Sequence, residues 1–334
     1  MPVTATVPSL STSLAGLALR NPVLLAAGTA GYLDEMSDAL DLSRVGGVVS
    51  KSITALPREG NETWRVIETR AGMLNAIGLA NVGIERFARD FAPRVASAPT
   101  AVIGSIAGFS IDDYVRVAAA MDEIDALGAV EVNVSCPNVH GGTEFGADPK
   151  SLRELVAALR PILSRTRMFV KLSPVVTGPL PIAELVRAAI EPNGTQGSGG
   201  TPAGPNSRPG ADAVCLANTT PAMAIDVRTR RPRLANITGG LSGPAVHAPA
   251  VKLVYDAYRL VGKPTGTPLV GIGGVMTWED AAEFILAGAS AVEMGTALFA
   301  DPRSPLKVVH GLERWVREQN AANIAELVGA VQTG

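Results

Sequence analysis

The sequence predicts an α/β protein with the fold of a (β/α)8 TIM barrel, and two patterns in its 334 residues lead to this prediction. Short runs rich in valine and isoleucine recur along the chain, and each is followed by a longer stretch with helical spacing of apolar residues. The runs are apolar throughout, as is typical of parallel strands covered on both faces. Eight such strand–helix pairs suit a barrel of ordinary size that forms one domain over residues 1–334.

The predicted elements begin with a segment at 10–22 that could form a small hairpin closing the bottom of the barrel. The eight predicted strands are 22–28, 45–52, 100–108, 129–136, 168–174, 211–219, 268–275 and 291–298. Helices are expected between them and after the last one, at 112–127, 149–165, 244–261, 277–287 and 305–331. Asp112 and Thr277 are the expected N-caps, and Asp280 three residues after Thr277 makes a partial capping box.

One segment, 191–210, breaks this pattern because it consists almost entirely of Gly, Pro, Ser, Thr, Asn and Gln. Such a composition cannot bury enough apolar surface to offset the entropy lost on ordering. We therefore expect a flexible surface insertion before the sixth strand. A doubly wound sheet is the alternative architecture, but the glycine fingerprint that such folds carry after their first strand is missing.

The overall composition excludes several classes of function. The chain has 29 Lys and Arg against 31 Asp and Glu, a net charge of −2, which offers no electrostatic footprint for nucleic acid or an anionic membrane. No apolar run approaches a membrane span, and the N-terminus lacks the layout of a signal peptide. Two cysteines cannot form a disulfide framework. These features predict a cytoplasmic enzyme.

Polar residues at the predicted strand ends indicate where the chemistry lies. In a barrel the active site gathers where strands end and the following loops begin. The side chains found at those ends are Lys51, Ser52, Ser105, Asn133, Cys136, Lys171, Asn218, Thr219 and Thr296. Strand ends are generally more polar than strand centres, but two lysines and two asparagines all at such ends favour a site. Converging at the barrel mouth, these groups would bind something polar and planar.

Glycine-rich turns after the last two strands indicate a phosphate site. The segments GIGGV (271–275) and MGTAL (294–298) place backbone N–H groups beside helix N-termini, the usual phosphate seat of such barrels. The segment LSGPAV (241–246) adds a further glycine just before a helix. None of the three is a P-loop, and glycine turns alone are weak evidence. Their position favours a cofactor that carries a phosphate.

The candidate for proton transfer is Cys136, which closes the fourth strand and opens a glycine-rich loop. A lone cysteine is usually a core residue, and we assign Cys215, in the middle of a strand, to the core. An accessible thiol at a strand end could instead accept a proton or act as a nucleophile. The three histidines are scattered, the carboxylates do not cluster, and no metal site is expected. The basic run 228–233 is expected to be a solvated loop.

Seven ordered motifs together resemble the class 1 dihydroorotate dehydrogenases. The most specific is NVSCPNVHGGTEFGADP (133–149), which is similar to the active-site loop of that family. The other motifs are MLNAIGLANVG (73–83), FVKLSP (169–174), ANTTPAM (217–223), TGGLSGPAV (238–246), GIGGV and MGTA. The resemblance extends from about residue 14 to residue 306 and is greater to the NAD-linked class 1B than to the fumarate-linked class 1A.

The resemblance implies a barrel that binds one FMN and oxidises (S)-dihydroorotate to orotate in pyrimidine biosynthesis. Cys136 would be the general base that takes the proton from C5, while hydride leaves C6 for the flavin. The substrate would be held by Lys51, Asn75, Ala76, Ile77, Gly78, Leu79, Asn133, Asn218 and Thr219. FMN would be held by Ala27, Lys51, Ser52, Ser105, Asn133, Lys171, Ala217, Gly243, Gly273, Gly274, Gly295 and Thr296.

Physical chemistry agrees with these implied roles. Asparagine side chains offer both a donor and an acceptor to a ring with paired amides. A lysine beside the flavin would stabilise negative charge on it electrostatically.

The chain departs from the family pattern at three places. The family usually has Ser where Ala27 stands and Asn where Ser105 stands, and the 191–210 insertion is not typical of it. The resemblance also implies a homodimeric core and an electron-transfer subunit with FAD and a 2Fe–2S cluster. Two cysteines are too few for such a cluster, so it would belong to another chain.

Three other functions remain open from the residues. Another FMN barrel acting on a pyrimidine base, such as a dihydropyrimidine dehydrogenase, is the nearest alternative. A tRNA dihydrouridine synthase would need a basic surface to bind RNA, and a net charge of −2 does not indicate one. A barrel that binds flavin without catalysis is the third, because a fold does not imply a function.

Overall fold

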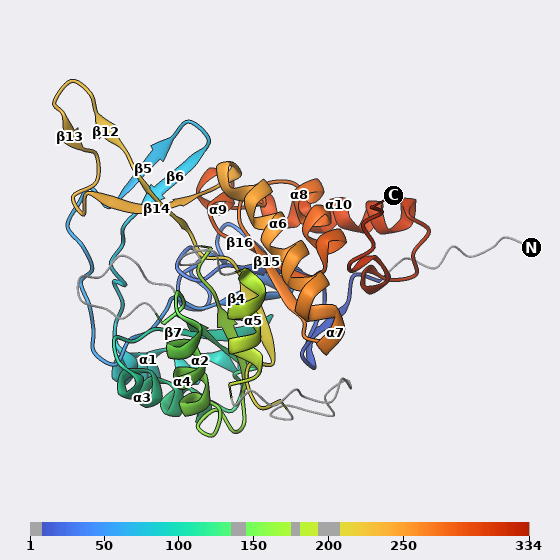
Figure 1. The fold of residues 1–334 in the computed structure, drawn as a ribbon, viewed down its shortest axis with the longest axis horizontal. Coiled ribbons are helices and arrows are strands. Elements are labelled where there is room, and N and C mark those ends of the chain that lie inside the picture. The colour runs from blue at the N-terminus through green and yellow to red at the C-terminus, as the bar shows by residue number, and fades with distance from the viewer. Residues whose placement is uncertain (1–8, 135–144, 175–180, 193–207, 334) are drawn as a thin grey trace, which may run out of the picture.

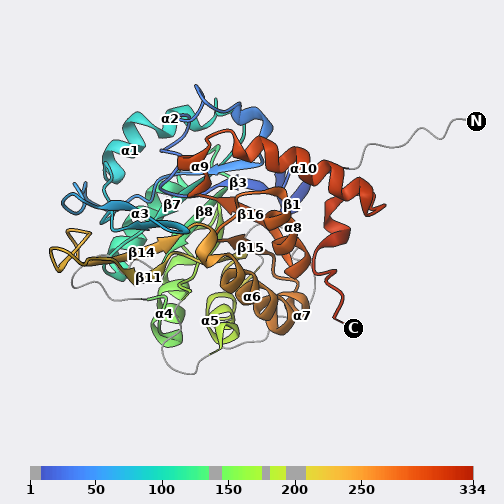
Figure 2. The same cartoon turned by 90° about the horizontal axis from the view of Figure 1, so that it is seen from above.

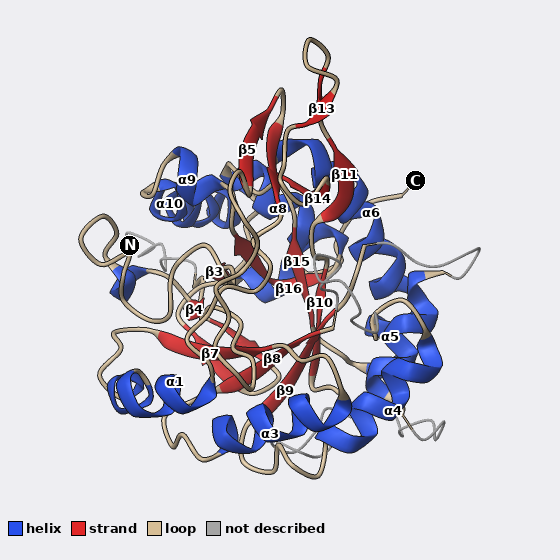
Figure 3. Cartoon of the chain, turned by 90° about the vertical axis from the view of Figure 1, so that its left-hand side faces the viewer, coloured by secondary structure: helices blue, strands red, loops and turns tan. Residues whose placement is uncertain are grey.

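A closed barrel of eight parallel strands forms the centre of the molecule (Figure 3). The computed structural model describes residues 9–134, 145–174, 181–192 and 208–333. The barrel strands are β3 (Val23–Leu25), β4 (Gly47–Val49), β7 (Ala101–Ile106), β8 (Ala129–Asn133), β9 (Arg167–Lys171), β10 (Ala213–Leu216), β15 (Leu269–Ile272) and β16 (Ala289–Met294). Each overlaps one predicted strand, so the predicted barrel is confirmed and the doubly wound alternative is excluded.

Helices cover the outside of the barrel (Figures 2 and 3). The α-helices are α1 (Ile84–Asp90), α2 (Ala92–Val95), α3 (Ile111–Asp122), α4 (Pro149–Leu159), α5 (Ile182–Ile190), α6 (His247–Ala257), α7 (Lys263–Thr265), α8 (Trp278–Ala287), α9 (Ala297–Ala300) and α10 (Ser304–Glu318). Short 3-10 turns lie at η1 (Leu42–Arg44), η2 (Pro244–Val246) and η4 (Ile324–Leu327), and η3 (Tyr258–Gly262) is a π-helical turn. The segment 191–210 connects α5 to β10, the sixth barrel strand, and most of it lies outside the described residues.

Two features of the predicted helix at 112–127 are wrong. Its N-cap is Ser110, whose backbone is extended and whose Oγ accepts a hydrogen bond from the N–H of Asp113 at 3.1 Å. Asp112 instead lies in the first turn, where its charge interacts favourably with the helix dipole. The helix ends at Asp122, whose carboxylate accepts backbone hydrogen bonds from Ser164 and Thr166 and so ties the helix end to the loop before β9.

The other helix boundaries follow from local chemistry. Helix α4 ends at Leu159 rather than at residue 165, because Pro161 has no N–H to continue the helical hydrogen bonds. The predicted helix at 244–261 is divided into η2, α6 and η3, and the one at 305–331 ends at Glu318. Thr277 is the N-cap of α8 as predicted, and its N–H donates to the Asp280 carboxylate at 2.8 Å.

The predicted N-terminal hairpin is confirmed, with β1 (Thr12–Leu14) and β2 (Leu17–Leu19) pairing antiparallel. It closes the end of the barrel at which the strands begin. Leu14 and Leu19 are buried against interior residues such as Leu24 and Phe169. The guanidinium of Arg167, at the start of β9, donates to the carbonyl of Ala15 at 2.7 Å.

A second sheet lies beyond the opposite end of the barrel (Figure 1). Its strands are β5 (Val66–Thr69), β6 (Gly72–Asn75), β11 (Thr220–Met223) and β14 (Thr238–Ser242), all paired antiparallel. A two-stranded ribbon, β12 (Ile225–Asp226) and β13 (Arg231–Pro232), extends past this sheet. The basic run 228–233 is exposed, as predicted, but it comprises the turn of the ribbon together with strand β13 and not a loop alone. Among the described residues, no helix has both the length and the apolar character needed to cross a membrane.

The side chains that point into the barrel change character along its axis. Near the strand starts this interior is apolar, with Ile103, Ala129, Phe169, Ala213 and Ala291 packed together. Since side chains alternate along a strand, the next inward positions lie two residues later. Those positions hold Ser105, Glu131, Lys171, Cys215 and Glu293, and all five are buried. A polar layer therefore lies on top of an apolar one, at the end of the barrel where the second sheet stands.

Candidate active site

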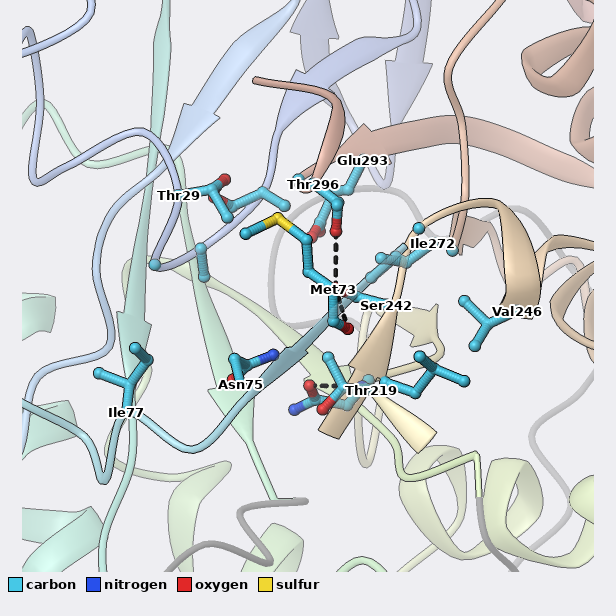
Figure 4. Close-up of a pocket in the computed structure, with 18 of the residues that line it drawn as sticks. Thr29, Met73, Asn75, Ile77, Thr219, Ser242, Val246, Ile272, Glu293 and Thr296 are labelled. Carbon is cyan, nitrogen blue, oxygen red and sulfur yellow. Dashed lines mark hydrogen bonds between the residues drawn. The ribbon is translucent and has the colours of Figure 1, made fainter. Parts of the chain in front are cut away.

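A pocket with a cavity volume of about 230 Å³ lies at the carboxyl ends of the barrel strands, beneath the second sheet (Figure 4). Strand ends on the barrel side contribute Asn133, Lys171 and Glu293, and the sheet contributes Met73, Asn75 and Ser242. Figure 4 shows Met73, Asn75, Ser242, Thr219 and Thr296 around the same hollow. A ligand in this pocket would therefore contact the barrel on one side and the antiparallel sheet on the other.

Three buried charged side chains meet at the floor of the pocket. Lys171 Nζ lies 2.9 Å from Glu293 Oε2 and 3.5 Å from Glu131 Oε1. Burial alone would lower the pKa of Lys171, but the two facing carboxyl groups outweigh it and hold that pKa well above its ordinary value. Lys171 is therefore a permanent cation at the pocket floor.

The same cluster keeps Cys215 protonated. Burial, and then the negative charge of Glu131 and Glu293, raise the pKa of its thiol well above the ordinary value. Cys215 is 1 % exposed and does not line the pocket. Its predicted assignment to the core is confirmed.

A chain of hydrogen bonds leads from the buried carboxyl group of Glu131 to the pocket wall. Ser105 Oγ donates to Glu131 Oε1 at 3.4 Å and lies 2.8 Å from Ser52 Oγ. The amide of Asn133 donates to Ser52 Oγ at 3.4 Å, and the amide of Asn218 donates to Asn133 Oδ1 at 3.1 Å. These bonds fix which end of each asparagine amide faces which neighbour, so the donors and acceptors of the wall are set before a ligand arrives.

Glycine turns from three segments converge at the other end of the pocket. A Cβ on Gly274 would lie 2.7 Å from the carbonyl oxygen of Gly243, and one on Gly243 would lie 2.7 Å from Cα of Gly72. Backbone therefore packs against backbone here, which only glycine permits. Thr296 Oγ1 donates to Ser242 Oγ at 2.8 Å beside these turns (Figure 4). Glycine turns beside a helix start, together with hydroxyl groups, are a common setting for an anion site.

The structure brings almost all the predicted site residues together. The lining of the pocket includes Ala27, Lys51, Ser52, Asn75, Ile77, Gly78, Leu79, Asn133, Lys171, Ala217, Asn218, Thr219, Gly243, Gly273, Gly274, Gly295 and Thr296. Two predicted residues lie behind the wall instead. Ala76 is buried in a small cluster with Leu74 and Leu234, and Ser105 lies beneath Ser52. Cys136 is outside the described residues.

The family profile of dihydroorotate dehydrogenase matches residues 9–196 and 204–316 of this chain. The chain belongs to the dihydroorotate dehydrogenase family. Its members are oxidoreductases, which agrees with the enzyme class that the motifs predict. The gap between the two matched stretches falls inside the 191–210 insertion, which the motifs mark as untypical of dihydroorotate dehydrogenases.

Similar proteins place the chain more finely within the dihydroorotate dehydrogenases. It is 44% identical over 326 residues to a protein of Pelobacter propionicus named dihydroorotate dehydrogenase B (NAD(+)), catalytic subunit, and 97% of this chain and 99% of that protein are covered. A protein of the same name from Bacteroides fragilis is 42% identical over 324 residues, again with 97% and 99% coverage. The resemblance to the class 1B branch is thereby confirmed.

Several residues of this dihydroorotate dehydrogenase pocket were not predicted from the sequence. They include Thr29, Met73, Ser242, Val246, Met276, Glu293 and Phe299. Glu293 carried a partial signal, because it is a charged residue in a mostly apolar strand, although the sequence does not show that its side chain points into the barrel. Met73 and Ser242 lie within quoted family motifs, but their own roles were not predicted, because they reach the pocket through the antiparallel sheet, whose strands pair across more than 160 residues of sequence.

The described residues also bring three potential metal ligands together. Side-chain atoms of Glu131, Cys215 and Glu293 lie within 4.8 Å of one another. The ammonium group of Lys171 already supplies the positive charge at this position. We therefore assign the cluster to charge pairing rather than to a metal.

Proposed function

We propose that this chain is the catalytic subunit of an NAD-linked dihydroorotate dehydrogenase that oxidises (S)-dihydroorotate to orotate in pyrimidine biosynthesis, in the cytoplasm. One observation carries the proposal: the residues that the family motifs assign to substrate and flavin nearly all line one pocket of a family member. We take residues 1–334 as one FMN-binding domain with a surface insertion at 191–210. A homodimeric core is part of the proposal and rests on family resemblance.

The residues present fit FMN. The close-packed glycines Gly243 and Gly274, together with Gly295 and Thr296, form a concave backbone surface suited to the phosphate. The buried Lys171 ammonium, aimed into the pocket, suits the electron-rich edge of the flavin ring. Where the family usually has Ser, Ala27 lines the pocket as a small apolar contact. These residues would hold FMN, which would supply the acceptor for the C6 hydrogen of dihydroorotate and its two electrons.

The chain's own residues would bind the substrate and take its proton. Asn75, Asn133 and Asn218 would pair with the ring amides, with the orientations that the hydrogen-bond chain imposes. Lys51 would hold the carboxylate of the substrate. The thiolate of Cys136 would accept the C5 proton, so the C5–H and C6–H bonds break and the C5=C6 double bond forms. Because an unperturbed thiol has a pKa of about 8.5, activity should rise with pH.

The electrons would leave the chain through another subunit. The similar proteins from P. propionicus and B. fragilis are named catalytic subunits of an NAD-linked enzyme, which indicates an accompanying chain. This sequence holds two cysteines, too few for an iron–sulfur cluster of its own. We therefore propose that a separate subunit with FAD and a 2Fe–2S cluster passes the electrons to NAD⁺.

The visible spectrum of the purified chain, recorded before and after anaerobic dihydroorotate, tests this function. A yellow protein whose flavin band bleaches within one turnover would support it. Bleaching by dihydrouracil but not by dihydroorotate would instead favour a dihydropyrimidine dehydrogenase. A protein that takes up FMN and bleaches with neither compound would favour a barrel that binds flavin without catalysis. A protein that cannot take up FMN would contradict the proposal.

Replacing Gly274 by alanine is expected to weaken both the fold and FMN binding. Gly274 has a φ of +68°, and a Cβ there would lie 2.7 Å from the Gly243 carbonyl oxygen and 2.8 Å from Cβ of His247. The left-handed backbone costs a residue with a Cβ about 1–2 kcal/mol, and the close contacts add to that cost. Urea denaturation measures the first effect, and quenching of FMN fluorescence on binding measures the second.

Gly266→Ala is the matched control for this change. Gly266 also has a left-handed backbone, with a φ of +63°, but its Cβ would meet only a guanidinium nitrogen of Arg208 at 3.9 Å. It does not line the pocket. Gly266→Ala should therefore lose stability without losing FMN affinity, and an equal loss of affinity in both variants would contradict a phosphate seat at Gly274.

A further inference from the structure

The buried charges at the pocket floor do not balance. One ammonium group, that of Lys171, faces two carboxyl groups, those of Glu131 and Glu293, and each of these side chains is 7 % exposed or less. With both carboxyl groups ionised, a net negative charge would be buried, which is costly in a medium of low polarity. A single proton on the carboxyl pair makes the cluster neutral.

A second observation points to the same proton. Oε2 of Glu131 is buried and has no hydrogen-bond partner within the described parts of the chain. Its other oxygen, Oε1, already faces Lys171 and the hydroxyl of Ser105. Buried polar atoms are almost always paired, so an unpaired carboxylate oxygen calls for a donor. Two side chains of the same cluster, with ligand atoms within 4.8 Å of Glu131, could supply it: the thiol of Cys215 and a protonated carboxyl group of Glu293. A thiol is only a weak donor, so a protonated Glu293 is the stronger partner.

We propose that Glu131 and Glu293 hold one proton between them, and that Glu293 is thereby a positioning residue that directs the Lys171 ammonium into the pocket and keeps the pocket floor neutral. The proton depends only on the cluster itself. Its effect on FMN rests on the proposed function.

Glu293 is surrounded by few groups that titrate. Glu131 on β8, Lys171 on β9 and Cys215 on β10 face it across the barrel, while the adjacent strands β3 and β15 carry only apolar side chains and glycine. Lys51 lines the same pocket. Burial raises the pKa of Glu293 to about 8, repulsion from Glu131 adds to the rise, and Lys171 opposes it. This titration belongs to the carboxyl pair as a unit.

The cluster should therefore change charge near pH 8. Below about pH 8 the floor is neutral, and above it the floor carries one negative charge. Negative charge beneath a bound flavin opposes the addition of electrons, so the reduction potential of FMN should fall more steeply with pH above this point.

Infrared spectroscopy of the full chain tests the shared proton without reference to substrate or activity. The wild-type protein should show the C=O stretch of a buried carboxylic acid at pH 7, and this band should disappear as the pH rises through about 8. Glu293→Gln should lack the band, because the remaining carboxylate of Glu131 pairs with Lys171. Glu279→Gln, the same substitution at an exposed position of α8, should keep it.

Two outcomes would overturn the inference: a wild-type protein with no carboxylic acid band at pH 7, and a band that persists in Glu293→Gln. If Glu293→Gln does not fold, Glu131→Gln is a second variant that should also lose the band. The pH titration of the wild-type band tests the shared proton without any variant.

Redox titration of the FMN-loaded chain tests the consequence for the flavin. The plot of reduction potential against pH should bend near pH 8 in the wild type and in Glu279→Gln, and should lack this bend in Glu293→Gln. A straight plot for the wild type would contradict a role of Glu293 toward the flavin. If the infrared band behaves as expected and the chain fails to bind FMN, the proposed function fails while the shared proton stands. If dihydroorotate bleaches bound FMN and no acid band exists, only the shared proton fails.

Discussion

Replacing Cys136 by alanine is expected to lower kcat for dihydroorotate oxidation by about 10²–10⁴-fold, the usual contribution of a general base. Alanine cannot accept the C5 proton, whereas the polar groups that would hold the substrate remain in the pocket. KM should therefore change little. Stopped-flow measurement of flavin bleaching isolates this step from electron transfer to the partner subunit. Full retention of the bleaching rate in Cys136→Ala would contradict the general-base role.

A Cys136→Ser variant and chemical labelling of the two cysteines provide further tests of the role of Cys136. A serine hydroxyl is a much weaker acid than a thiol, so Cys136→Ser should be slow and should need a higher pH.

Cys136 and Cys215 are the two cysteines of the chain, and Cys215 is buried and protonated. Iodoacetamide should therefore inactivate the wild type by modifying Cys136 alone. Mass spectrometry that finds the label on Cys215 instead would contradict this assignment.

Replacing Lys171 by methionine is expected to give the largest loss of stability, about 3–5 kcal/mol, because it removes one partner of a buried ion pair. Glu131 and Glu293 would then face each other without a cation, 1 % exposed each. FMN affinity should fall as well, since the positive charge at the pocket floor is lost. Urea denaturation at pH 7 measures the first effect.

The double variant Lys171→Met, Glu293→Gln is the control for this prediction. It removes the cation together with one of the two carboxyl groups, so it should recover part of the stability that Lys171→Met loses. Exposed ion pairs contribute little, so Lys307→Met, which removes the cation beside Asp301 on the surface, should be nearly neutral. Equal losses in the single and double variants would show that Lys171 stabilises the fold through packing rather than through charge.

The barrel and most of the pocket were predictable because the strand ends are marked in the sequence. Lys171, Asn133 and Asn218 each close an apolar run, and closed parallel strands bring their carboxyl ends to one mouth. Thr277 was recognised as a cap because Asp280 follows at the spacing of a capping box. In each case the structural consequence depends on a few neighbouring residues.

The antiparallel sheet and the orientation of the buried polar side chains could not be predicted from neighbouring residues, because both depend on contacts between distant parts of the chain. The sheet of β5, β6, β11 and β14 joins segments of only four or five residues that show no regular alternation of apolar and polar residues, so nothing local indicates their pairing. Glu131 and Glu293 look like interruptions of apolar strands until the barrel closes and turns both inward. Ser105, predicted as a flavin contact, does not line the pocket itself, and its Oγ lies 2.8 Å from that of Ser52, which does.

Because Glu293 lies on β16, the last barrel strand in the sequence, closure of the barrel changes the protonation of a buried carboxyl group. Glu131 and Lys171 lie on neighbouring strands and form a balanced pair, and β16 then adds a second carboxyl group to it. In the unfolded chain this group ionises near its ordinary pKa of 4.5, and in the folded chain only near 8. Between these two values the folded chain binds the extra proton, so the free energy of unfolding falls as the pH rises through that interval. Between these pH values, folding of the barrel is thus accompanied by the uptake of a proton, and alkaline solution lowers the stability of the closed barrel.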